Sequence, residues 1–106
     1  MANSRLAQLR AMLVEEPGDQ FLRYAIAMES KRAGNTEGAM AELEALITEH
    51  PKYLACYYQL ALLLASLDRV PEAVEACRAG ALQSLVAGDG RARAELLALA
   101  QALEVG

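Results

Sequence analysis

A chain of 106 residues with a formal net charge of −4 has room for a single small domain, 1–106. Its basic residues are not gathered into a basic face, so nucleic acid is not an expected partner. Two cysteines are too few for a disulfide framework. Ala and Leu dominate the composition and aromatic residues are scarce, which favours an all-α fold.

No segment has the features of a membrane anchor or a signal peptide. The most apolar stretch, 54–67, contains Gln59 and Ser66 and falls short of the roughly 20 apolar residues that span a bilayer. Charged residues interrupt the beginning of the chain, where a signal peptide would need a continuous apolar run. Cys56 and Cys77 lie among apolar neighbours, so we expect buried, reduced thiols in a cytoplasmic protein.

Turn-forming residues divide the chain into six segments with apolar residues at three- and four-residue spacing, which predicts six helices. In chain order the predicted helices span about 3–16, 20–33, 36–49, 53–67, 70–86 and 90–104. The expected N-terminal caps are Asn3 or Ser4, Asp19, Asn35 or Thr36, and Asp89, with Pro71 in the first turn of the fifth helix. Linkers of two to five residues make neighbouring helices antiparallel.

The sequence repeats itself with a period of 34 residues. The pairs at this spacing include Ala27 and Ala61, Ala39 and Ala73, Leu43 and Cys77, Leu9 and Leu43, Met12 and Leu46, Tyr24 and Tyr58, and Pro17 and Pro51. Such a period in helix–turn–helix units resembles the tetratricopeptide repeat. We expect the small residues at Ala27, Ala61, Ala39 and Ala73, with Gly80, to let helix axes approach closely.

The second unit resembles the family pattern more closely than the first. It carries an aromatic, a large, a small and a bulky residue on its first helix, followed by a small and a bulky residue on its second: Tyr57, Leu60, Ala61 and Leu64, then Ala73 and Cys77. In the first unit Arg23 replaces the aromatic residue and Ser30 the bulky one.

The resemblance implies a right-handed α–α superhelix of antiparallel hairpins, similar to small free-standing bacterial members of the family. Its parts would be a half-repeat over 3–18, full repeats over 20–53 and 54–87, and a closing helix over 89–104.

Family members usually bind a protein or peptide in the concave groove formed by the first helix of each hairpin. By position, the resemblance assigns partner binding to Phe21, Tyr24, Met28, Arg32, Tyr58 and Leu62, with Lys31, Ala55, Ala65 and Ser66 beside them. Two alternatives remain open. In the first, the closing helix covers this surface, since apolar residues at helical spacing usually belong to a core. In the second, two copies form a homodimer, either through this surface or through the exposed side of the first helix.

A carboxylate clamp, which some family members build from Lys, Asn and Arg, is not expected. The corresponding places hold Tyr24, Met28 and Gln59, and only Arg91 or Arg93 could add charge. An enzyme is not expected either, and an enzyme accessory subunit is a remote alternative. The single histidine, His50, precedes Pro51 at a helix end and suits a capping role. Neither His50 nor the cysteines have a metal-ligand spacing, so we expect no metal, cofactor or catalytic residue.

Overall fold

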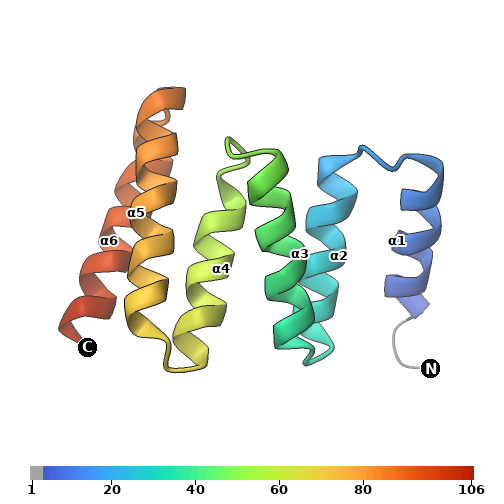
Figure 1. The fold of residues 1–106 in the computed structure, drawn as a ribbon, viewed down its shortest axis with the longest axis horizontal. Coiled ribbons are helices and arrows are strands. Elements are labelled where there is room, and N and C mark those ends of the chain that lie inside the picture. Colours follow the sequence, from blue (N-terminus) through green and yellow to red (C-terminus); the bar gives the residue numbers. More distant parts are fainter. Residues whose placement is uncertain (1–3) are drawn as a thin grey trace.

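Six helices make up residues 4–106, the part of the chain that the computed structural model describes (Figure 1). They are α1 (Ser4–Glu15), α2 (Gln20–Arg32), α3 (Thr36–Glu49), α4 (Ala55–Ser66), α5 (Val70–Ala87) and α6 (Gly90–Val105). The all-α prediction is confirmed, and each helix begins and ends within two residues of its expected bounds. Asn3, one of the expected caps, lies outside the described residues.

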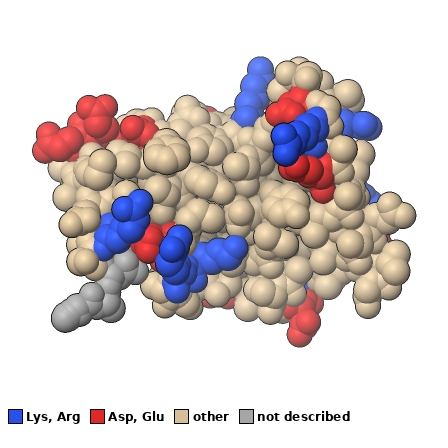
Figure 2. Space-filling view, turned by 180° about the vertical axis from the view of Figure 1, so that it is seen from behind, with Lys and Arg blue, Asp and Glu red and all other residues tan. Residues whose placement is uncertain are grey.

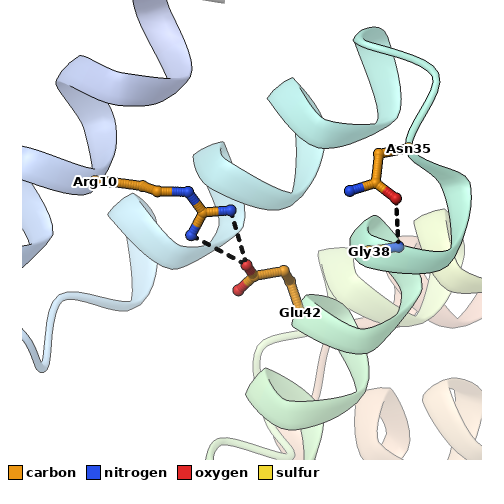
Figure 3. A network of polar contacts seen from close by, with 4 residues as sticks. All are labelled: Arg10, Asn35, Gly38 and Glu42. Carbon is orange, nitrogen blue, oxygen red and sulfur yellow. Dashed lines mark hydrogen bonds and ion pairs between the residues drawn. The ribbon is translucent and has the colours of Figure 1, made fainter.

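Side-chain caps fix the starts of three helices. In each, the side-chain oxygen accepts a hydrogen bond from the N–H three residues later: Asp19 from Leu22 (3.0 Å), Asn35 from Gly38 (2.9 Å, Figure 3) and Asp89 from Ala92 (3.0 Å). Pro71 stands in the first turn of α5, where its missing N–H costs nothing. Gly88 ends α5 with a φ of 73°, a left-handed conformation that glycine adopts without strain.

The helices alternate in direction and stand side by side in chain order, with α1 at one end of the array and α6 at the other (Figure 1). The molecule measures 40 × 29 × 19 Å along its principal axes. Each helix packs chiefly on its neighbours in sequence, and α6 also touches α4. The two end helices therefore have a neighbour on one side only.

The main core lies between α2, α3, α4 and α5. The four alanines expected at the helix crossings are all fully buried, together with bulky residues of α3: Ala27, Ala39, Ala61 and Ala73, with Leu43 and Leu46. Gly80 is equally tight, because a Cβ built there would lie 2.6 Å from the Cβ of Tyr57 and 2.9 Å from Cδ1 of Leu96. The expected close approach of α5 to its neighbours is confirmed.

A smaller core joins α1 to α2, where Leu9, Leu22 and Ile26 pack together. Ion pairs reinforce this end of the array. Arg10 on α1 reaches Glu42 on α3 at 3.5 Å (Figure 3). The second helices of successive hairpins thus lie within side-chain reach of one another.

Candidate partner-binding groove

The residues predicted to bind a partner lie on α2 and α4 and differ in exposure. Phe21 is 68% exposed and Arg32 is also exposed, whereas the other four are half-buried: Tyr24, Met28, Tyr58 and Leu62. Tyr24 packs against Tyr53, which precedes α4, with ring centroids 5.6 Å apart and planes inclined by 23°. Burial is the main cause that raises the pKa of both phenols.

A cleft of about 380 Å³ brings part of this set together with two neighbours. It is lined by Met28, Lys31 and Arg32 of α2 and by Gln59 of α4. The Lys31 ammonium donates a hydrogen bond of 2.9 Å to Oε1 of Gln59, which holds the charge across the groove. Lys31 and Arg32, both placed on the groove by the resemblance, therefore supply positive charge to this cleft, and neither Arg91 nor Arg93 lines it.

Tyr58 lies in a different place, beside the closing helix. It lines a cleft of about 250 Å³ with Ala55 and with residues at the start of α6, among them Glu95 and Leu96. The closing helix thus covers part of Tyr58, while the cleft at Met28 and Arg32 has no lining residue from α6. Phe21 and Leu62 line neither of these clefts.

A larger hollow of about 650 Å³ next to the groove was not anticipated. It lies between the start of α2 and the segment joining α3 to α4, and is lined by Gln20, Glu49, His50, Pro51, Lys52, Tyr53, Leu54 and Ala55. On one side of it, Arg23 donates two hydrogen bonds to Glu49, at 2.8 and 3.2 Å. This pairing lowers the pKa of Glu49 and ties α2 to α3.

Both cysteines among the described residues lack the environment of a nucleophile. Cys56 is fully buried, and burial raises the pKa of its thiol to about 11, the reverse of what a nucleophilic cysteine needs. Cys77 is also a free, buried thiol. Within residues 4–106 no group of His, Cys, Asp and Glu side chains is placed to hold a metal ion. None of the helices in that range is both long and apolar enough to cross a bilayer.

Large apolar side chains at the end of α5 also lie at the surface, outside the groove. Leu82, Leu85 and Val86 are 60%, 60% and 64% exposed. None of the three was predicted from the sequence to lie on a binding surface. The available signal was the length of α5, whose last residues have no counterpart in the shorter α3.

The arrangement of hairpins defines a helical-repeat protein, and comparison with solved structures identifies its family. The solution structure of a tetratricopeptide repeat domain protein from Salinibacter ruber is 32% identical, with a TM-score of 0.80 over 83% of this chain and 89% of that one. A crystal structure of a tetratricopeptide repeat domain protein from Salinibacter ruber is 31% identical, with a TM-score of 0.75 over 81% and 96%. This chain belongs to the tetratricopeptide repeat family.

A third solved structure shares the fold at lower identity. The solution structure of a protein from Bordetella parapertussis is 21% identical, with a TM-score of 0.81 over 93% of this chain and 86% of that one. No protein-family model matches the sequence, and no curated protein matches it. The family assignment therefore rests on the Salinibacter structures.

Proposed function

We propose that this chain is a non-catalytic protein-interaction module that binds an extended segment of a partner protein along α2 and α4. The observation that carries this proposal is the cleft lined by Met28, Lys31, Arg32 and Gln59. It places two cations beside an apolar side chain on the face to which the family resemblance assigns binding. We also propose a cytoplasmic location, because two buried free thiols suit a reducing compartment.

The chemistry of the cleft indicates what kind of segment fits. Met28 is half-buried and adaptable, so it suits a bulky apolar side chain of the partner. Lys31 and the exposed Arg32 suit a carboxylate next to that side chain. Arg32 already lies 3.6 Å from Glu29, a long ion pair that a stronger acceptor can replace.

The proposed binding site differs from a carboxylate clamp in the residues that it contains. One cation pairs with an amide across the groove, through the contact of Lys31 with Gln59, and the places of the other clamp residues hold Tyr24 and Met28. The preferred ligand is therefore a segment with an acidic residue beside an apolar one. Its position in the partner chain, internal or C-terminal, is not restricted.

The two lysines of the chain provide a matched test. Peptides selected by display against the wild type should bind Lys31→Ala roughly tenfold more weakly, because a charge-assisted contact is lost. They should bind Lys52→Ala as tightly as wild type, since Lys52 lines the neighbouring hollow instead. Weakening by Lys52→Ala alone would move the site to that hollow and refute the proposal, as would equal binding by all three proteins.

A further inference from the structure

The two ends of the helical array each leave apolar residues uncovered. Met12 on α1 is 52% exposed, whereas Leu46, 34 residues later on α3, is fully buried. Leu97 on α6 is 38% exposed and lies eight residues after the cap Asp89. Ala27 lies eight residues after the corresponding cap Asp19 and is fully buried. Each end thus exposes the side that a neighbouring helix covers inside the array.

The same two ends carry the separate halves of an ion pair found inside the array. Arg23, four residues after Asp19, bonds to Glu49, the last residue of α3. Arg93 lies four residues after its own cap on α6, and Glu15 is the last residue of α1. Both are exposed, and neither makes an ion pair within residues 4–106. The α1 end therefore carries the carboxylate of such a pair, on Glu15, and the α6 end carries the guanidinium, on Arg93.

The directions of the end helices bring these halves to the same edge. In Figure 1, α1 ends at the upper edge of the array, and α6 starts at that edge and runs the opposite way. If a second copy is displaced along the long axis, its α1 lies antiparallel to α6 of the first copy. Within one copy, α3 lies antiparallel to α2 in the same way. Figure 2 shows acidic atoms at the upper corner of the α1 end and basic atoms, with some acidic ones, near the upper corner of the α6 end.

We propose that copies of this chain associate head to tail, with α1 of one copy packed on α6 of the next. Glu15 of the second copy pairs with Arg93, and its Met12 covers Leu97 and Leu85. Leu85 suits this role, because it is 60% exposed and lines a cleft of about 250 Å³ with Arg93. Inside one copy, Arg10 of α1 contacts Glu42 of α3, which is the second helix of the neighbouring hairpin. In the same way, α1 of the second copy comes within reach of α5, the second helix of the last hairpin, which carries Leu85.

The contact is heterologous, and a displacement of successive copies along the long axis does not return to the first copy, so the assembly is open-ended. The surfaces lie at opposite ends of a molecule 40 Å long, and a two-fold dimer cannot join both pairs at once. Leu97 replaces the small residue found at the inner crossings, which keeps the helix axes further apart than in the hairpins. The association is therefore weak and reversible. It uses residues outside the groove, so it is independent of the proposed peptide binding.

Charge reversal tests the pairing directly. Sedimentation of the 106-residue chain in low salt should show a mass that rises with concentration past twice the monomer mass. Glu15→Arg and Arg93→Glu should each raise the apparent dissociation constant about tenfold or more, because like charges then meet. A mixture of the two variants should recover association through alternating copies, since each junction between unlike variants joins opposite charges. The double variant should associate as wild type does, because all of its junctions join opposite charges.

Neighbouring residues give the matched controls. Glu16→Arg and Arg91→Glu change the net charge equally but should leave association almost unchanged. Glu16 lies beyond the last residue of α1, and Arg91, two residues before Arg93, points to another side of α6. Melting curves confirm that the variants fold. A wild type that stays monomeric, growth that stops at a dimer, equal loss in the controls, or no recovery in the mixture would each overturn the proposal.

Discussion

Gly80 offers a substitution for which helix propensity and packing predict opposite signs. It lies inside α5, where replacing glycine by alanine normally stabilises a helix by about 1 kcal/mol. In this fold the added Cβ would lie 2.6 Å from Cβ and 2.7 Å from Cγ of Tyr57. The Cβ atom is fixed by the backbone of α4, so no rotamer change of Tyr57 moves it away.

The size of the effect follows from the distance. Carbon atoms in contact usually lie about 3.5–4.0 Å apart, so Gly80→Ala requires α5 to move about 1 Å away from α4. Overpacking of this kind costs about 1–3 kcal/mol, and the immobile base of Tyr57 places this site in the upper half of the range. After subtracting the gain in helix propensity, we expect a net loss of about 1–2 kcal/mol.

Urea unfolding monitored by helical circular dichroism measures this directly. Gly90→Ala is the matched control, because nothing lies within 4 Å of a Cβ at that position in α6. We expect Gly90→Ala to be neutral or slightly stabilising, and Gly80→Ala to lower the melting temperature by about 4 °C or more per kcal/mol lost. If both substitutions raise the unfolding midpoint, the close contact between α5 and Tyr57 does not limit the side chain at position 80.

Substitutions at three further residues test two hydrogen bonds and the burial of one thiol. Tyr57→Phe removes the hydroxyl that donates a 2.6 Å hydrogen bond to the carbonyl of Pro51, so urea unfolding should show a loss of about 1 kcal/mol; an unchanged midpoint would contradict it. Asp19→Ala removes the oxygen that accepts from Leu22 N–H and should also cost about 1 kcal/mol, whereas Asp19→Asn, which keeps a capping oxygen, should cost much less. Burial raises the pKa of Cys56 from 9.0 to about 11, so the folded state holds this proton more tightly than the unfolded state, and the resulting stability is lost as pH rises between these values. Wild type should therefore lose up to about 2 kcal/mol more than Cys56→Ala over that interval, as measured by urea unfolding at each pH, and parallel curves for the two proteins would refute this.

The fold was predictable because its signals are local and repeat along the chain. Asp19 and Asp89 mark helix starts through a hydrogen bond that spans three residues, so the flanking sequence alone identifies them. The alanines at the helix crossings recur at one spacing because each hairpin solves the same packing problem. Such features need no knowledge of how distant segments meet.

The groove was less predictable, because its shape depends on contacts between segments that the repeat does not relate. Tyr53 stacks on Tyr24, yet the residue 34 positions before it is Asp19, so comparing the repeats gives no sign of an aromatic partner. Lys31 of α2 donates a hydrogen bond to Gln59 of α4. The position of Lys31 in the cleft therefore depends on how α2 and α4 lie relative to each other. Exposure also differs within the nominated set, since the start of α6 half-covers Tyr58.

The last helix shows how a repeat period can point to the wrong residue. Two periods of 34 after Arg23 lead to Arg91, but the position of the cap and the burial of Leu96 place Arg93 at the equivalent site. The cause is α5, which has 18 residues where α3 has 14 and so displaces the start of α6. Arg91 instead contacts Glu95 at 3.4 Å on another side of the helix. The association experiment therefore tests the structural register against the sequence period. The structural register predicts that Arg93→Glu weakens association, whereas the sequence period predicts this of Arg91→Glu.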